Sequence, residues 1–315
     1  MIDRQVQTPV AMIIFNRPET TQKVFEAVRQ ARPSKLFLIA DAPRPNRLDD
    51  QEKCAATRAI VEQVDWPCEV YKNYAESNLG CGLRPATGID WVFQNTEEAI
   101  ILEDDCLPDP TFFQYCDELL AYYRHEPRIM TVCGLNVQFG RRRTQDSYYF
   151  SHFNHCWGWA SWRRAWQKFD YKMHLWPEVR DGGWLMDLLG DEYAVKVWTD
   201  AFDVTYADKL NGCWDFQWIF AMWMHGGLAT LPNVNLIANI GIGKNAGGTH
   251  TIEDSEYSSM TTEAMDFPLK HPRFVIRDRR ADDFTQNTYF DYKPGFTKKV
   301  RNKLRKLIKG SLVKP

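Results

Sequence analysis

The sequence predicts an α/β protein with a mixed, mostly parallel sheet and helices on both faces. Over the first hundred residues, short apolar runs recur roughly every 30 residues, and longer amphipathic segments lie between them. The runs are continuously apolar, as in strands that are buried on both faces. Strands that alternate with helices in this way form βαβ units, and such units build a parallel sheet.

Each element of this first half has a local signal. The run from Pro9 to Phe15 is continuously apolar, and Pro18 suits the first turn of a helix whose apolar face carries Val24, Phe25 and Val28. A broken, glycine-containing loop at 78–82 precedes a further helix. We therefore expect strands at 9–15, 36–40, 68–71 and 99–102, and helices from Pro18, at 49–64 and at 83–93.

After residue 110 the pattern becomes mixed. A helix is expected at 112–123 and a strand at 129–133, whereas the Trp-rich stretch 151–235 indicates helices with large loops. Glycines and polar residues predict a loop at 241–259. Neither a GxGxxG nor a GxxxxGK[ST] motif occurs, so no dinucleotide fingerprint or P-loop is present.

The charges divide the chain into two parts. The formal net charge is -2, but residues 298–315 hold eight Lys and Arg and no acid, which leaves 31 bases and 41 acids in residues 1–297. An acidic body argues against nucleic-acid binding. The tail has apolar residues between its bases and is expected to be an amphipathic helix on an anionic membrane, or else a solvated terminus.

Cysteine and tryptophan usage bear on location and binding. The eight Cys are dispersed without a CxxC pair, no apolar leader opens the sequence, and no run of about 18 apolar residues could span a membrane. We expect reduced thiols and a cytoplasmic protein, with peripheral attachment to the inner face of the plasma membrane as an option. The 12 Trp suit either sugar stacking or core packing.

Three acids, Glu103, Asp104 and Asp105, directly follow the expected strand at 99–102. Clustered carboxylates repel one another unless a cation offsets them, and hard divalent ions accept carboxylate and phosphate oxygens together. Ligands of parallel sheets bind beyond the carboxyl ends of the strands. The acids therefore indicate a metal–diphosphate site, with a solvated acidic turn as the alternative.

The run from Glu103 to Phe113 resembles the metal-binding "EDD" region of the alpha-1,3-mannosyl-glycoprotein beta-1,2-N-acetylglucosaminyltransferase family and its bacterial relatives, which are nucleotide-diphospho-sugar transferases of the GT-A fold. Four other segments are similar to that family in the same order: 9–17, 39–41, 155–159 and 214–218. In the family, the strand matching 9–15 ends in Asp-Arg, whereas this chain has Asn16-Arg17.

The resemblance implies roles for individual residues. Arg17 would meet the diphosphate, with Asn16 beside it, Asp41 would meet the uracil, and Asp105 would bind Mn²⁺ or Mg²⁺. Glu103 and Asp104 would contact the nucleotide. It also implies a Rossmann-like nucleotide-sugar half at 1–110 and an acceptor-binding catalytic half at 111–255. The extension at 256–297 and the tail at 298–315 have no counterpart in the resemblance.

Asp215 would be the general base, because an acceptor hydroxyl must lose its proton as it attacks. Apolar neighbours, Trp214 and Phe216, would raise the pKa of such a carboxylate. A single displacement inverts the anomeric centre. The alternative is that Asp215 only caps the helix that follows.

Other candidates are weaker. His250, in a glycine-rich stretch, would reach the metal or phosphate, or else is an exposed loop residue. Arg84 is either a nucleotide contact or a helix surface charge. Trp157, Trp159 and Trp214 would form an acceptor or sugar wall, with core packing as the rival. The group His152, His155 and Cys156 indicates a packed aromatic loop rather than a zinc site.

Together these features predict an inverting, metal-dependent glycosyltransferase. It would move a sugar, with GlcNAc as one candidate, from a UDP-sugar to a hydroxyl of a glycan or lipid-linked glycan in bacterial surface polysaccharide synthesis. Acidic clusters also suit a nucleotidyltransferase or a metal-dependent phosphohydrolase. A non-enzymic carbohydrate-binding protein is the third alternative, although the chain lacks the turn-punctuated short strands of lectins.

Overall fold

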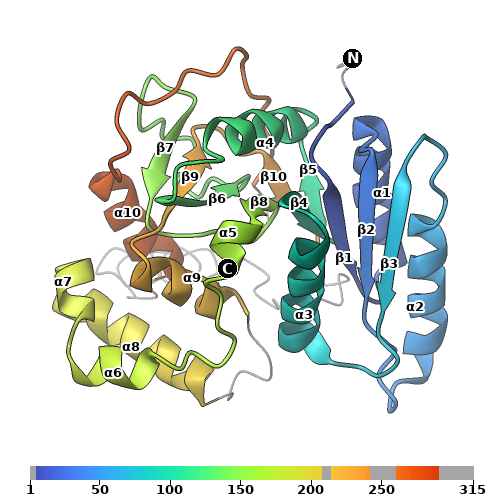
Figure 1. Ribbon diagram of the computed structural model, residues 1–315, viewed down its shortest axis with the longest axis horizontal. Helices are drawn as coiled ribbons and strands as arrows, with labels where there is room; N and C mark the ends of the chain where they lie inside the picture. The colour runs from blue at the N-terminus through green and yellow to red at the C-terminus, as the bar shows by residue number, and fades with distance from the viewer. Residues whose placement is uncertain (1–4, 208–213, 242–259, 291–315) are drawn as a thin grey trace, which may run out of the picture.

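The computed structural model describes residues 5–207, 214–241 and 260–290, and it confirms the α/β fold (Figure 1). Its main sheet has eight strands in the order β3-β2-β1-β4-β8-β6-β9-β7. The strands are β1 (Val10–Ile14), β2 (Lys35–Ala40), β3 (Glu69–Tyr74), β4 (Glu98–Glu103), β6 (Ile129–Cys133), β7 (Tyr148–Ser151), β8 (Trp159–Trp162) and β9 (Leu228–Pro232). A two-stranded ribbon pairs β5 (Cys106–Pro108) with β10 (Ile237–Asn239).

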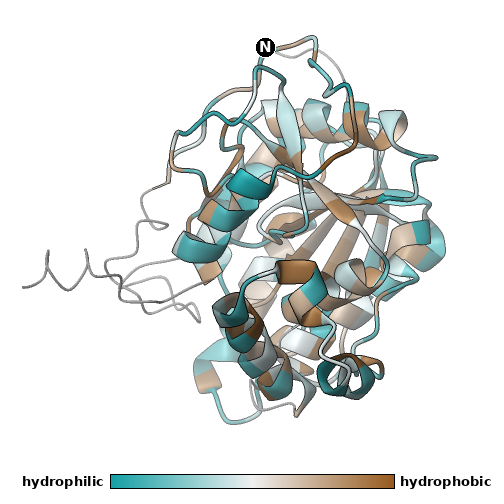
Figure 2. Ribbon diagram, turned by 90° about the vertical axis from the view of Figure 1, so that its left-hand side faces the viewer, coloured by the Kyte–Doolittle hydropathy of each residue, from teal (hydrophilic) through white to brown (hydrophobic). Residues whose placement is uncertain are grey.

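Helices cover both faces of this sheet. They are α1 (Pro18–Ala31), α2 (Leu48–Val61), α3 (Gly80–Asn95), α4 (Thr111–Tyr122), α5 (Arg163–Trp166), α6 (Trp176–Asp181), α7 (Leu185–Leu189), α8 (Glu192–Tyr206), α9 (Asp215–Met224) and α10 (Arg279–Thr285), followed by a π-helical turn at Gln286–Phe290. Apolar side chains of α1, α2 and α4 pack on one face, and those of α3, α5 and α9 pack on the other. Figure 2 shows the apolar strands enclosed by helices with hydrophilic outer sides.

The sheet is mostly parallel, as predicted. β1 pairs in parallel with β2 and β4, β2 with β3, and β6 with β9. Only β8 and β7 run antiparallel to their neighbours. Because β8 is antiparallel to both β4 and β6, these two strands point the same way. The carboxyl ends of β1, β2, β3, β4, β6 and β9 therefore lie along one edge.

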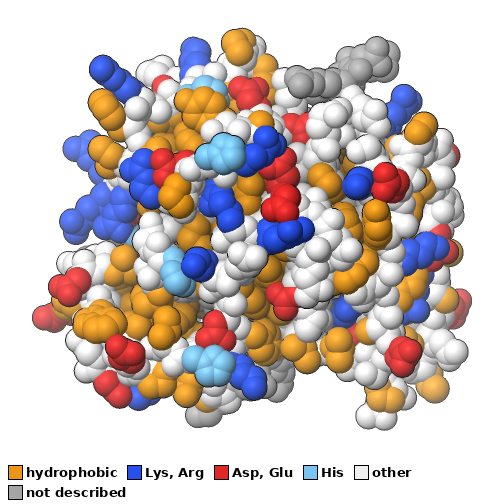
Figure 3. All heavy atoms as spheres, viewed as in Figure 1, with side chains coloured by type: hydrophobic (Ala, Val, Ile, Leu, Met, Phe, Trp, Pro, Cys, Tyr) orange, Lys and Arg blue, Asp and Glu red, His pale blue; other side chains and the backbone are white. Residues whose placement is uncertain are grey.

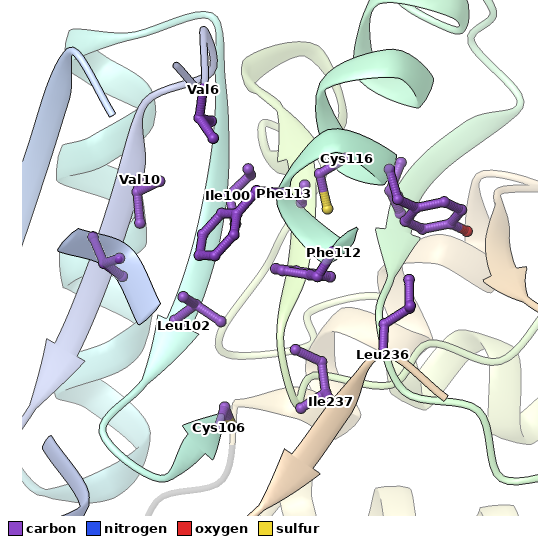
Figure 4. Close-up of a cluster of buried hydrophobic side chains, with 14 of the residues drawn as sticks. Val6, Val10, Ile100, Leu102, Cys106, Phe112, Phe113, Cys116, Leu236 and Ile237 are labelled. Atoms are coloured by element: carbon purple, nitrogen blue, oxygen red, sulfur yellow. The ribbon is translucent and has the colours of Figure 1, made fainter. Parts of the chain in front are cut away.

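The chain reverses its direction of travel across the sheet at β1. It runs from β1 outward to β2 and β3, and then returns to place β4 on the other side of β1. The junction of β1 and β4 is thus a topological switch point, where the connecting segments diverge and leave a crevice. α4 closes the core beside this junction, since Phe112, Phe113 and Cys116 face Ile100 and Leu102 of β4 (Figure 4).

The interpretation of 151–235 as helices and loops was incomplete. β8 and β9 fall in this stretch, and β8 lies near the middle of the sheet. The four residues of β8 are all buried, so they show no alternation of apolar and polar side chains that would mark a strand. The remaining helices, α6 to α9, enclose a core of their own around Trp176, Trp198 and Phe220.

The extension after residue 256 folds back onto the main sheet where the structure describes it. Arg277 forms a parallel bridge with Phe150, and the amide of Asp278 donates to the Phe150 carbonyl at 2.7 Å. Ala281 of α10 is buried in the core. The tail at 298–315 lies outside the described residues. In the described ranges, no helix has the length and apolar character needed to cross a bilayer.

Docking of α10 buries Asp282, whose carboxylate accepts from the Ser151 hydroxyl at 2.5 Å. Burial raises the pKa of Asp282 to about 7, although Ser151, His152 and Arg277 oppose the rise. Because the folded-state pKa exceeds the usual 3.8, the folded state holds the proton more tightly, and its stability falls as pH rises from about 4 to about 7.

Asp282→Asn is therefore expected to stabilise the protein relative to wild type progressively as pH rises. The difference in free energy of unfolding between Asp282→Asn and wild type should change by at most about 1.4 kcal/mol per pH unit. Urea unfolding between pH 5 and 7 measures it, with Asp283→Asn, an exposed neighbour on α10, as the control. A difference that stays constant over this range would contradict the prediction.

Candidate functional site

The predicted site residues meet at the switch point of the sheet. Asn16 and Arg17 follow β1, Asp104 and Asp105 follow β4, and Asp41 follows β2. Register brings these ends together, because Ile13 of β1 lies opposite both Ile39 of β2 and Glu103 of β4. Ligands of such sheets bind at this place, so the residues lie where a site is expected, and their roles remain predictions.

Arg17 forms ion pairs with two of the three acids. One terminal nitrogen of its guanidinium lies 2.6 Å from Asp105 Oδ2 and 3.2 Å from Asp104 Oδ1. The amide of Phe15 donates to Asp104 Oδ2 at 3.0 Å. Both carboxylates are buried, whereas the Arg17 side chain is 22% exposed, so the cation is the member of this group that meets solvent.

Carboxyl groups outnumber cations at the site. Burial, with Asp105, Asp104 and Asp215 nearby, raises the pKa of Glu103 to about 8. Burial likewise raises the pKa of Asp104 to about 7 against the opposing effect of Arg17. Glu103, Asp104 and Asp105 interact with the guanidinium of Arg17, and Asp215 acts on Glu103. A further cation would therefore be stabilised here.

Asp215 comes from the far part of the chain to this same place. It is the first residue of α9, and its charge contributes to the raised pKa of Glu103. The N-cap position of α9 is occupied by Trp214 without a side-chain capping bond. A carboxylate in the first turn also interacts favourably with the helix dipole, so a structural contribution of Asp215 to α9 coexists with its place beside the acids.

The acids of the candidate site do not form a complete metal-binding site by themselves. Within the described ranges, no group of three or more His, Cys, Asp or Glu side chains is arranged to hold a metal ion. His250, the second predicted ligand, lies outside the described residues. The donor chemistry nevertheless fits a hard divalent ion, because Mg²⁺-type ions commonly use one or two protein carboxylates and complete their shell with substrate phosphates and water.

Asp41 binds the loop that leads into α3. Its buried carboxylate accepts from the amides of Ala42, Leu79 and Gly80 at 2.8–3.2 Å and from the side chain of Asn78 at 3.1 Å. These bonds tie the end of β2 to the start of α3, where Gly80 has a positive φ of 80°. The uracil contact remains a prediction, and in this structure Asp41 orders the loop that would face the base.

Asn16 points toward a buried acid that the sequence did not reveal. Its amide donates to Asp50 Oδ1 at 2.7 Å, and Arg44 pairs with the same carboxylate through bonds of 2.5 and 2.9 Å. These bonds lower the pKa of Asp50 far below its usual value. Asp50 has no motif around it, and only its burial on the amphipathic helix α2 could have singled it out.

Arg84 is buried, which excludes the helix-surface alternative. It donates to the carbonyl and the side-chain oxygen of Asn73 at 2.5 and 2.8 Å, while its buried Nε has no hydrogen-bond partner. Burial lowers the pKa of Arg84, and nearby Asp41 opposes this effect. Arg84 therefore binds β3 near Asp41, and its contact with the nucleotide remains a prediction.

The predicted sugar wall is largely core, which corrects the interpretation of two tryptophans. Trp159 is 0% and Trp214 4% exposed, and their rings stack on each other at 5.7 Å. Fully enclosed rings present no face to a sugar. Trp157 is partly buried and packs against the apolar core. Of the three tryptophans, it is the one with exposed surface that a sugar could contact. His155 is also buried, and burial lowers its pKa to about 3.

A glycine missed in the sequence lies against the metal-binding candidate. The amide of Ile240 donates to the Asp105 carbonyl at 2.8 Å, and a Cβ added at Gly241 would lie 2.1 Å from Asp105 Oδ2. The ribbon of β5 and β10 brings these residues together. Only a residue without a side chain fits at position 241. No local sequence pattern indicates such a long-range contact.

Gly241→Ala is expected to displace the Asp105 carboxylate and to weaken metal-dependent nucleotide binding by about tenfold, a typical loss when a ligand is misplaced. Isothermal titration with UDP and Mn²⁺ measures the affinity. Gly140→Ala is the control for backbone strain away from Asp105, because its added Cβ meets nothing within 4 Å but its φ of 77° disfavours a side chain. Thermal unfolding of both variants is measured alongside. Unchanged affinity in Gly241→Ala would show that Asp105 does not need this close approach.

Comparisons with known proteins give only distant structural neighbours. No family model matches the chain, and no curated protein matches it in sequence. The mannosyltransferase PcManGT from Pyrobaculum calidifontis, solved with GDP-Man and Mn²⁺, is 12% identical with a TM-score of 0.35, over 50% of this chain and 45% of that one. Mouse xyloside xylosyltransferase 1 is 11% identical with a TM-score of 0.34, over 69% and 81% of the two chains.

A UDP-glucose pyrophosphorylase complexed with UDP-glucose is 11% identical with a TM-score of 0.28, over 47% of this chain and 63% of that one. The chain thus spans less than half of the mannosyltransferase and less than two thirds of the pyrophosphorylase. Because every one of these TM-scores lies below 0.5, the neighbours do not define a family for this protein.

Proposed function

We propose that this protein is a glycosyltransferase that uses a nucleotide-diphospho-sugar. The observation that carries the proposal is the meeting of Arg17 with Asp104 and Asp105 at the switch point, within the electrostatic reach of Asp215. A diphosphate leaving group requires positive charge, and an attacking hydroxyl requires a carboxylate. Residues from three distant segments of the chain would supply this cation and this carboxylate.

A divalent ion, Mn²⁺ or Mg²⁺, would be held by Asp105 together with the diphosphate oxygens of the donor, with His250 as a further candidate ligand. When bound, the ion would offset the charge that develops on the leaving nucleotide. The excess of buried carboxyl groups over cations at the site supports its binding. Arg17, the exposed cation of the group, would contact the same diphosphate.

Asp215 would accept the proton of the acceptor hydroxyl, and one displacement would then invert the anomeric centre. Asp41, Asn16 and Arg84 would shape the nucleotide pocket, through the loop before α3 and the Asp50 contact. Trp157 would line the acceptor side. We propose a UDP-sugar donor, with GlcNAc as one candidate sugar, and a glycan or lipid-linked glycan acceptor of bacterial surface polysaccharide synthesis.

Product identity tests this function against its alternatives. UDP-GlcNAc, UDP-glucose, UDP-galactose and GDP-mannose are first screened by thermal shift with and without Mn²⁺, and the stabilising donor is then incubated with the protein. Release of the nucleoside diphosphate supports sugar transfer or its hydrolytic side reaction. Release of pyrophosphate or inorganic phosphate would instead identify a nucleotidyltransferase or a phosphohydrolase. Stabilisation by no nucleotide sugar would overturn the proposal.

A further inference from the structure

The segment 270–280, which leads into α10, exposes apolar and basic side chains together. Phe274 is 62% and Ile276 is 70% exposed, and they are separated by a single residue. Arg273 precedes them, with its guanidinium 5.2 Å from the centre of the Phe274 ring, and Arg277 follows them. Single exposed apolar residues are common, but an exposed Phe and Ile between arginines form an amphipathic patch.

The segment carries an excess of positive charge. Residues 270–280 contain five Lys and Arg and one acid, Asp278, which accepts the amide of Ala281 as the cap of α10. Lys270, Arg273 and Arg280 are exposed, and none of them forms an ion pair with an acid of the described ranges. Their charges are therefore available to a partner.

The loop that carries Arg141 and Arg143 adds positive charge beside α10. The guanidinium groups of Arg141 and Arg143 lie 4.5 and 5.1 Å from the ring centre of Phe284, which belongs to α10. This contact places Arg141, an exposed residue, next to α10. Figure 3 shows Lys and Arg gathered along the left edge of the molecule, over the segment that leads into α10, with apolar side chains among them.

The patch is held rigidly by the sheet. The amide of Ser147 donates to the Lys270 carbonyl at 2.9 Å, and the Lys270 amide donates to the Ser147 hydroxyl at 2.9 Å. At the other end, Asp278 and Arg277 are tied to Phe150 at the centre of β7. A surface that is already ordered loses little conformational entropy when it binds.

We propose that this basic–apolar surface, formed by Lys270, Arg273, Phe274, Ile276 and Arg280 with Arg141, docks on an anionic phospholipid membrane. The cations would attract acidic headgroups, and Phe274 and Ile276 would enter the interface between headgroups and acyl chains. The surface differs from the basic tail at 298–315. That tail is not its occupant, because eight bases without an acid would be repelled by it.

Co-sedimentation of the full chain with vesicles tests the proposal. Vesicles of phosphatidylcholine alone are compared with anionic vesicles that contain about 30% phosphatidylglycerol. Wild type is expected to bind the anionic vesicles at least tenfold more tightly than the neutral ones, and high salt should weaken this binding. Failure to bind anionic vesicles, or equal binding to both, would overturn the proposal.

Two double variants separate the charge from the apolar contribution. Arg273→Glu with Arg280→Glu should weaken binding to anionic vesicles more than about 25-fold, since each lost cation alone costs roughly fivefold. Phe274→Ser with Ile276→Ser should weaken it about tenfold. All four positions are exposed, so folding should be preserved, and thermal unfolding checks this.

The matched controls are Lys23→Glu on α1 and Leu48→Ser on α2, which change an exposed cation and an exposed apolar residue elsewhere. Their vesicle binding should equal that of wild type. If the two double variants bind like wild type, the membrane contact lies in another part of the chain and the proposal fails. If only the arginine variant loses binding, Phe274 and Ile276 do not enter the bilayer, which contradicts the proposed contact.

Discussion

Asp215→Asn is expected to lower the rate of sugar transfer by about 10³-fold while it leaves donor binding intact. The amide keeps the shape of the carboxylate and its place at the start of α9, but it cannot accept a proton from the attacking hydroxyl. Steady-state kinetics with the donor identified by thermal shift gives kcat, and titration with UDP and Mn²⁺ gives the affinity. A loss confined to kcat is the signature of a base.

The control for this variant is Asp187→Asn, an exposed acid of α7 in the same part of the chain. It should transfer sugar at the wild-type rate. If Asp215→Asn transfers sugar at the wild-type rate, Asp215 is not the general base. In that case its contribution to the first turn of α9 and to the charge near Glu103 would be structural.

Asp105→Ala should abolish the metal-dependent part of nucleotide binding, a loss of about 100-fold in affinity for UDP. The charge-assisted contact of one ligand carboxylate contributes about 1.5–3 kcal/mol, and the metal it would hold also anchors the diphosphate. The variant should bind UDP equally with Mn²⁺ and with a chelator, and wild type in chelator should match it. Isothermal titration in the four combinations measures this.

Arg17 makes this second experiment more informative. In the variant Arg17 keeps its ion pair with Asp104, so the cation stays in place and only the metal ligand is lost. Thermal unfolding of the ligand-free variant should therefore change little compared with the change in affinity. Affinity for UDP that still responds to Mn²⁺ in Asp105→Ala would exclude Asp105 as the ligand.

The sequence predicted the first half of the fold well because its signals are local. Pro18 and the buried face of α1, the apolar runs of β1 and β2, and the acids after β4 each lie within a few residues. The carboxyl ends of parallel strands must lie on one edge, so these short-range signals also predicted that the candidate residues would lie close together. The same reasoning could not place β8, whose four buried residues carry no alternating pattern.

The parts of the site that the sequence missed depend on contacts between distant segments. Gly241 lies against Asp105 through the pairing of β5 with β10, which are about 130 residues apart. Asp50 holds Asn16 and Arg44 from a helix face that looks ordinary in the sequence. The stacking of Trp159 on Trp214 likewise depends on tertiary packing, so composition alone could not separate a sugar platform from a core.

The antiparallel strand β8 has a consequence for motion. It is hydrogen-bonded to β4 on one side and to β6 on the other, so the two parts of the chain share a continuous backbone ladder at Ile100, Ala160 and Val132. A hinge between two lobes would have to break those hydrogen bonds. Closure around a donor must therefore come from segments outside the sheet, and the radius of gyration measured by X-ray scattering should change little when a nucleotide sugar binds.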